Sequence, residues 1–296
     1  MELTVRVPGS CGELLQGMKA GNPFLVTCPV GSYTTVRISD TLAGIHGLGR
    51  KSLMALEKTL TSLGKEELPW GLCLESSLPR GKGMASSSAD IAATVAAVAL
   101  AFGYRTYPEE IMRMAAGIEP TDGVFYPQVV CINHMNGDWL ASYQGLPAFR
   151  ISIFDTGGVI DTLSYHEQVK EDGAANRSAE ALALFEKGWR AQDETLIAEA
   201  ASMSACNNQS LLYKDGLEEL LAFAKERGAL GINIAHSGTV IGVLWPERFP
   251  DDDLQRETRA IRCRFPHLSF LMQTRLQGGG VQVAEGKQQE FVELFR

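Results

Sequence analysis

The sequence predicts an α+β protein built from two domains. Short stretches rich in β-forming residues alternate with helical stretches in the first half, which also contains a long, alanine-rich helix. After Gly145 the pattern starts again with a strand and continues with further helices and strands. This order of elements is typical of two mixed domains in succession. We expect an N-terminal domain over residues 1–148 and a C-terminal domain over 149–296.

The N-terminal half opens with a strand. Apolar and polar residues alternate from Leu3 to Val7, and the strand is expected to run into a turn at Pro8-Gly9. Gly44–Ser52 resembles a P-loop but carries Arg50 where that motif has lysine, so we interpret it as a loop. The other elements expected here are strands within 24–38 and 70–74 and helices over 52–63 and about 88–102.

The second half repeats this mixture. The expected elements are a strand over 149–154, helices near 178–188, 192–205, 215–227 and 251–264, and strands over 231–235, 240–245 and, closing the chain, 268–272. A tight turn at His236-Ser237-Gly238 separates two of these strands.

Composition excludes several classes of function. A net charge of −8 and a pI near 5.3 disfavour nucleic acid as a partner, because a protein that binds the phosphate backbone needs a basic surface. The six cysteines form no C-x-x-C pair, and the five histidines form no H-x-x-x-H pair, so no zinc site is expected. No signal peptide or apolar run of membrane-spanning length is recognised, so we expect a cytoplasmic protein without membrane contact.

One segment carries the clearest chemical signal. Leu78–Asp90 (LPRGKGMASSSAD) is rich in glycine and serine and lies between a strand and the start of the long helix. A helix N-terminus presents unpaired N–H groups and a partial positive charge, which together favour phosphate oxygens. Serine hydroxyls add donors or a Mg²⁺ ligand, and Lys82 adds a positive charge. The alternative is a capped turn without a ligand.

Pro79–Ala89 resembles the central motif of the GHMP kinases, written roughly P-x-x-x-G-L-G-S-S-A-A. Pro79, Gly83, Ser86, Ser87 and Ala89 match it, whereas Met84, Ala85 and Ser88 depart from it. Two more motifs of this family have counterparts in the expected order, at Pro8–Gly17 (PGSCGELLQG) and Ala235–Val240 (AHSGTV).

The resemblance implies a fold and a chemistry. It implies a ribosomal-protein-S5-like N-terminal domain, a ferredoxin-like C-terminal domain, and transfer of a phosphoryl group from ATP with Mg²⁺. Together with GIEPTDGVFY, the motifs look most like the branch of the family that phosphorylates L-threonine for cobalamin synthesis. The small-molecule acceptor implied is therefore L-threonine.

The resemblance also implies residue roles. The residues expected to bind ATP phosphates are Pro79, Gly81, Lys82, Gly83, Met84, Ala85, Ser86, Ser87 and Ser88. Ser87 and Glu119 are the expected Mg²⁺ ligands. Asp122 is the expected base or positioning group, so the catalytic set is Asp122, Ser87 and Lys82. An acidic surface turn at 119–123 is the alternative reading of the two carboxylates.

A threonine substrate needs an anion for its ammonium group, and Glu13 is the candidate. The other residues expected near the substrate are Cys11, Gly12, His236, Ser237 and Gly238, although a lone histidine is often structural. The open alternatives for the function are a GHMP kinase acting on homoserine or another alcohol, and a catalytically silent ligand sensor. The oligomeric state is expected to be a monomer or a homodimer.

Overall fold

The computed structural model describes residues 1–145, 147–158, 174–286 and 290–295. Its strands are β1 (Glu2–Lys19), β2 (Asn22–Ser39), β3 (Ile45–His46), β4 (Gly71–Ser76), β5 (Val129–Ile132), β6 (Trp139–Tyr143), β7 (Phe149–Asp155), β8 (Gly231–Ile234), β9 (Val240–Pro246), β10 (Ser269–Arg275), β11 (Gln282–Glu285) and β12 (Val292–Glu293). Its α-helices are α1 (Arg50–Ser62), α2 (Ser86–Ala101), α3 (Pro108–Ala116), α5 (Ala174–Ala191), α6 (Glu194–Asn207), α7 (Leu217–Lys225) and α8 (Asp251–Arg264). The expected α+β class is confirmed.

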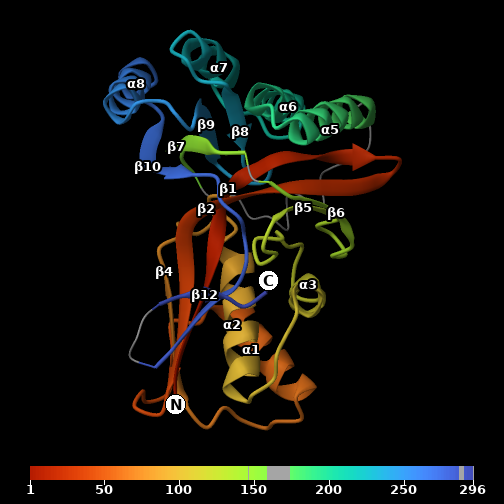
Figure 1. Cartoon of the computed structure of the whole chain (residues 1–296), viewed down its shortest axis with the longest axis vertical. Helices are drawn as coiled ribbons and strands as arrows, with labels where there is room; N and C mark the ends of the chain where they lie inside the picture. The colour runs from red at the N-terminus through yellow and green to blue at the C-terminus, as the bar shows by residue number, and fades with distance from the viewer. Residues whose placement is uncertain (146, 159–173, 287–289, 296) are drawn as a thin grey trace.

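One continuous sheet joins both halves of the chain. The strand order is β10-β7-β9-β8-β1-β2-β4-β3, with β11 beside β1 and with the β5–β6 pair beside β2. Helices α1, α2 and α3 lie in the lower part of Figure 1, and α5 to α8 lie around the upper part. The long hairpin of β1 and β2 runs through both parts, so these two strands connect the two halves of the structure.

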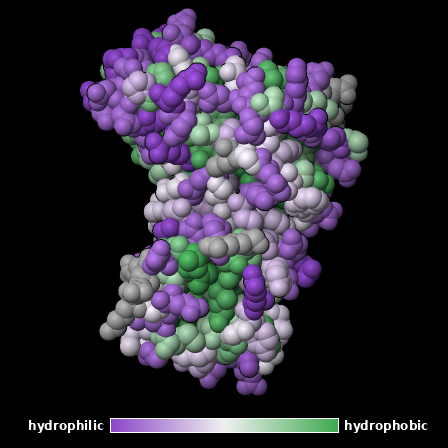
Figure 2. All heavy atoms as spheres, in the orientation of Figure 1, coloured by the Kyte–Doolittle hydropathy of each residue, from purple (hydrophilic) through white to green (hydrophobic). Residues whose placement is uncertain are grey.

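Two hydrophobic clusters fill the interior. The larger one joins the hairpin to α1 and α2 and extends to α5 and α6. The smaller one lies under α7 and α8 and includes Trp245, Phe154 and Leu254. Figure 2 shows a largely polar surface over α7 and α8 and an apolar area on the lower half of the same face. No helix in the described part of the chain is long and apolar enough to cross a membrane.

The expected turn at Pro8-Gly9 is wrong, because β1 continues to Lys19. The pairing with β2 changes register at Pro8/Gly9 and again on each side of Glu13. At these irregularities Ser10 N donates to Met84 O at 3.0 Å and Gly12 N donates to Gly83 O at 3.1 Å. The proline and glycines therefore form bulges that turn strand N–H groups toward another loop.

No serine side chain caps the N-terminus of α2, although serine is a common N-cap residue. The helix begins at Ser86, its N-cap is Ala85 with φ = 53°, and no side chain caps it. The hydroxyls of Ser87 and Ser88 bond instead to the segment 119–122. The serines are thus used for tertiary contacts, and the first N–H groups of α2 carry no side-chain cap.

The predicted order of elements was incomplete in other places as well. The segment that we interpreted as a loop over Gly44–Ser52 contains β3 and the first turn of α1. After β10 the chain does not end but adds β11, which pairs with β1. These short or irregular segments lack the periodicity that identifies longer elements.

Glycines allow three distant segments to meet. A Cβ atom on Gly238 would lie 2.5 Å from both Gly83 Cα and Lys82 O, and one on Gly83 would lie 2.3 Å from Ala235 Cβ. Thr239 N and Val240 N both donate to Lys82 O, at 2.9 and 3.2 Å. The loop before α2 is therefore bonded to β1 on one side and to the turn after β8 on the other.

We predict that Gly238→Ala destabilises the protein by about 1–3 kcal/mol, because the added methyl would overlap backbone atoms that other hydrogen bonds hold in place. Urea unfolding measures the change. Gly31→Ala is the matched control, since its Cβ would have no neighbour closer than 3.6 Å, and it should shift the unfolding free energy by less than about 0.5 kcal/mol. Equal effects of the two variants would contradict the proposed close contact.

Candidate active site

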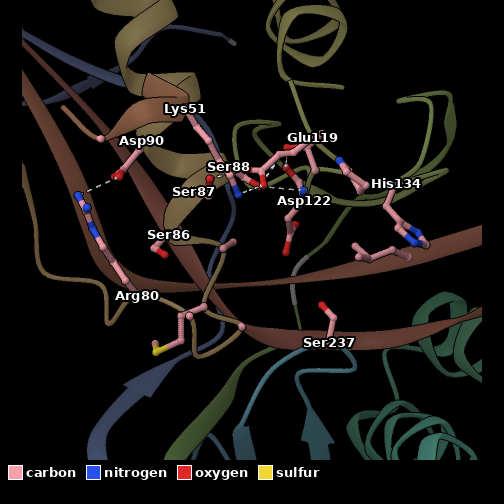
Figure 3. Close-up of a pocket in the computed structure, with 18 of the residues that line it drawn as sticks. Lys51, Arg80, Ser86, Ser87, Ser88, Asp90, Glu119, Asp122, His134 and Ser237 are labelled. Atoms are coloured by element: carbon pink, nitrogen blue, oxygen red, sulfur yellow. Dashed lines mark hydrogen bonds and ion pairs between the residues drawn. The ribbon is translucent and has the colours of Figure 1, made fainter. Parts of the chain in front are cut away.

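A cavity of about 500 Å³ opens beside the N-terminus of α2. Four chain segments form most of its wall: the start of α1, the loop before α2 with the first turn of that helix, the turn after α3, and the bulged part of β1. Figure 3 shows Lys51, Ser87, Ser88, Glu119 and Asp122 close together, with Ser237 apart from them in the lower part of the view. Its lining residues are Glu13, Gln16, Leu25, Gly49, Arg50, Lys51, Ser52, Arg80, Gly81, Gly83, Met84, Ala85, Ser86, Ser87, Ser88, Asp90, Glu119, Pro120, Thr121, Asp122, His134 and Ser237.

The loop before α2 brings backbone N–H groups to this cavity. Gly81, Gly83 and Ala85 all have positive φ, at 69°, 80° and 53°, which curls the chain tightly before the helix begins. The uncapped first turn of α2 then faces the cavity with Ser86, Ser87 and Ser88. A helix N-terminus of this kind favours anions such as phosphate.

Ser87 and Glu119 form the hard-oxygen pair of the site. The Ser87 hydroxyl donates to Glu119 Oε1, and the Lys51 ammonium donates to Glu119 Oε2. Among the described residues no three His, Cys, Asp or Glu side chains cluster as a metal cage. Mg²⁺ needs no such cage, because it usually takes one or two protein oxygens and completes its shell with phosphate and water. The pair therefore fits a nucleotide-bound magnesium ion.

Asp122 is a buried residue in the wall of the cavity. Ser10 Oγ donates to its Oδ2 at 3.2 Å, and its backbone N donates to Ser88 Oγ at 3.0 Å. Its Oδ1 is buried without a hydrogen-bond partner in the described part of the chain. Burial, with a smaller contribution from the nearby negative charge of Glu13, raises the pKa of Asp122 to about 8.

Glu13 is held by the turn that follows β8. Its Oε2 accepts from His236 N at 2.8 Å and contacts His236 Nδ1 at 3.0 Å. The other ring nitrogen, Nε2, lies 2.9 Å from Ser204 Oγ on α6. Nearby, the buried Lys214 ammonium donates to Gly238 O at 2.7 Å, and burial lowers its pKa to about 8. The structure thus fixes the Glu13 carboxylate at the edge of the cavity.

Most of the residues predicted from sequence line this cavity. These are Glu13, Gly81, Gly83, Met84, Ala85, Ser86, Ser87, Ser88, Glu119, Asp122 and Ser237. Their individual roles stay predictions.

Six predicted residues lie outside the lining: Pro79, Lys82, Cys11, Gly12, His236 and Gly238. Cys11 is fully buried, with its Sγ 3.8 Å from Asn233 Oδ1, and burial raises the pKa of its thiol. Gly12 and Gly238 support the loop before α2, and His236 supports Glu13.

Lys82 is directed away from the expected phosphate position. Its ammonium forms an ion pair with Asp155 Oδ2 at 2.7 Å and donates to Gly158 O at 2.6 Å. In this arrangement its charge is balanced at the end of β7. Its side chain therefore bonds the loop to the second half of the chain.

Sequence reasoning missed the wall formed by Gly49–Ser52, and with it Lys51. It also missed Arg80 and His134 as lining residues. Asp90 accepts from Thr34 Oγ1 at 2.7 Å and pairs with Arg80 at 3.4 Å. Lys51 lies within Gly44–Ser52, which the sequence indicates only as a loop because Arg50 breaks the P-loop pattern.

Comparison with known proteins identifies the family. Residues 51–125 match the family described as GHMP kinases N terminal domain. An L-threonine kinase from Citrobacter freundii is 31% identical over 284 residues, which cover 93% of this chain and 98% of that protein. This chain is a GHMP kinase.

Other relatives agree with this assignment. An L-threonine kinase from Salmonella typhimurium is 32% identical over 244 residues, covering 80% of this chain and 81% of that protein. The structure of a putative homoserine kinase from Listeria monocytogenes superposes with a TM-score of 0.70 at 17% identity, covering 96% of this chain and 100% of that one. The GHMP kinase fold is therefore present, and the protein is a small-molecule kinase that phosphorylates an alcohol.

The buried Asp122 predicts a pH dependence of stability. The folded protein retains the Asp122 proton up to about pH 8, whereas the unfolded chain releases it near pH 3.8. Between these values the folded state binds more protons, so the contribution of Asp122 to stability falls as pH rises. Asp122→Asn removes this effect. The unfolding free energy of the variant relative to wild type should therefore increase from pH 5 to pH 8.5, by up to about 4 kcal/mol.

Urea unfolding of both proteins at several pH values measures this difference. A difference that stays constant across the range would show that Asp122 titrates equally in the folded and unfolded chains.

Proposed function

We propose that this GHMP kinase transfers the γ-phosphoryl group of ATP to the side-chain hydroxyl of L-threonine and forms L-threonine O-3-phosphate for cobalamin synthesis. The observation that carries the proposal is the pairing of two opposite environments in one cavity. The wall of this cavity contains the uncapped N-terminus of α2 and also the carboxylates of Glu13 and Asp122. Two relatives that match this chain over most of its length, at 31% and 32% identity, are L-threonine kinases.

The phosphate end of the cavity suits a triphosphate. Backbone N–H groups of the loop before α2 and the helix N-terminus supply donors, and Arg50 and Arg80 add positive charge to the lining. Ser87 and Glu119 would hold Mg²⁺, which neutralises phosphate charge when it is bound. Phosphoryl transfer depends on this alignment and neutralisation more than on covalent chemistry.

The acidic end of the cavity suits an amino acid acceptor. Glu13 is fixed by His236 and would receive the ammonium group of threonine. The unpartnered Oδ1 of Asp122 would accept the hydroxyl proton as the hydroxyl oxygen bonds to the γ-phosphorus and ADP leaves. The raised pKa makes the Asp122 carboxylate a stronger base, and the positive charge of a bound ammonium lowers that pKa toward neutrality.

An acceptor panel tests this proposal. The purified protein is given Mg-ATP with L-threonine, L-homoserine, L-serine or 3-hydroxybutyrate, which is threonine without its amino group. ADP release is measured, and the product is identified by phosphorus NMR. We expect kcat/KM for L-threonine to exceed that for 3-hydroxybutyrate by at least about 100-fold, because a buried carboxylate without its cation is costly.

Glu13→Gln separates the ammonium contact from general damage. We expect the variant to lose about 100-fold in kcat/KM for threonine and to keep its kcat/KM for 3-hydroxybutyrate, with KM for ATP unchanged. Glu75→Gln, on the exposed surface of β4, is the matched control and should leave all three values unchanged. Turnover with homoserine and with no other acceptor would mean that the protein is a kinase whose substrate is homoserine rather than threonine. Binding of ATP without turnover of any acceptor would support the ligand-sensor reading.

A further inference from the structure

Lys51 occupies a position that the motifs of the family do not account for. It is the second residue of α1, on the wall of the cavity formed by Gly49–Ser52. Its ammonium donates to Glu119 Oε2, while Ser87 holds Glu119 Oε1. Figure 3 shows Lys51 extending from its helix toward Ser87 and Glu119. Lys51 and Ser87 therefore bind the two oxygens of the same carboxylate.

The Glu119 carboxylate requires a positive partner. Its side chain is only 4% exposed, and a buried carboxylate without a countercharge is strongly unfavourable. In this structure the Lys51 ammonium supplies that charge. A magnesium ion held by Glu119 and Ser87 would supply it instead, and two cations at one carboxylate repel each other strongly where water is scarce.

Lys51 has both the reach and the freedom to leave. Its side chain is 37% exposed, and a lysine ammonium on a four-carbon stem is a mobile point charge. The loop before α2 and the first turn of that helix line the same cavity as Lys51. A triphosphate bound there would offer several negatively charged oxygens to the released ammonium.

We propose that Lys51 is a positioning residue that exchanges partners. In the free protein it is the counter-ion of Glu119 and opposes binding of a divalent cation; when nucleotide and metal arrive together, it moves to the phosphate oxygens. The exchange couples metal binding to nucleotide binding. This inference rests on the proposed use of ATP and Mg²⁺ and goes beyond it by predicting that the metal binds more tightly with the nucleotide than alone.

A purely structural ion pair would behave differently. Its removal would lower stability but would not increase the affinity of the site for a metal. The decisive quantity is therefore the affinity for a divalent cation in the absence of nucleotide, with Mn²⁺ as the probe and free Mn²⁺ measured by electron paramagnetic resonance.

We expect Lys51→Met to bind Mn²⁺ about tenfold more tightly than wild type without nucleotide, because the competing charge is gone. With the non-hydrolysable analogue AMP-PNP present, the same variant should bind the Mn²⁺–nucleotide complex about tenfold more weakly, because a phosphate contact is lost. Lys51→Arg should remain close to wild type in both measurements, since it keeps the charge.

Lys58→Met is the matched control. Lys58 lies on the same helix and donates to Gly117 O at 3.3 Å, outside the cavity lining, so its loss should change neither affinity. If Lys51→Met fails to fold, Lys51→Gln removes the charge while keeping a polar partner for Glu119, and the same changes are expected.

Unchanged or weaker Mn²⁺ affinity in the charge-removing variant without nucleotide would overturn the inference, as would an absence of detectable Mn²⁺ binding in both proteins. These outcomes differ from a failure of the proposed function. A wild-type enzyme that phosphorylates threonine while its Lys51 variants keep wild-type metal affinity would refute only the partner exchange.

Discussion

The close contact between Gly83 and Gly238 is the constraint on which the rest of the structure depends. Neither residue has room for a Cβ atom, and each lies on a segment that the other holds in place. Backbone bonds from Gly12 on one side and from Thr239 on the other complete the junction. Two segments separated by most of the chain thus fix the loop before α2, and that loop in turn fixes where the N-terminus of α2 points.

The junction also explains how the cavity combines two different kinds of group. The bulges in β1 that supply N–H groups to the loop carry Glu13 to the cavity edge, and the turn that holds Gly238 also carries His236, which bonds Glu13. One backbone arrangement therefore places N–H groups that can bind phosphate and the carboxylate of Glu13 in the same space. Charges in that space interact strongly because little water screens them. The buried carboxylates of Glu119 and Asp122 are therefore stable only with a partner, which can be Lys51, a metal, a proton or a substrate cation.

The sequence predicted long elements and glycine motifs well and irregular features poorly. Alanine content and periodicity located α2 and α8. The three motifs and the GIEPTDGVFY segment together located half of the residues that line the cavity. The register shifts of β1 could not be predicted from the sequence, because Pro8-Gly9 normally indicates a turn. Three other features were not predicted: the position of Lys51 beside Glu119, the orientation of Lys82 toward Asp155 and the capping of α2. They depend on contacts between distant segments, which no local pattern encodes.

The most direct test of this account is a crystal structure of the protein with AMP-PNP, Mg²⁺ and L-threonine. The account predicts the γ-phosphate at the N-terminus of α2, the metal between Ser87 and Glu119, the threonine ammonium at Glu13 and its hydroxyl facing Asp122. Nucleotide bound away from the loop before α2, or threonine with its ammonium directed away from Glu13, would contradict it.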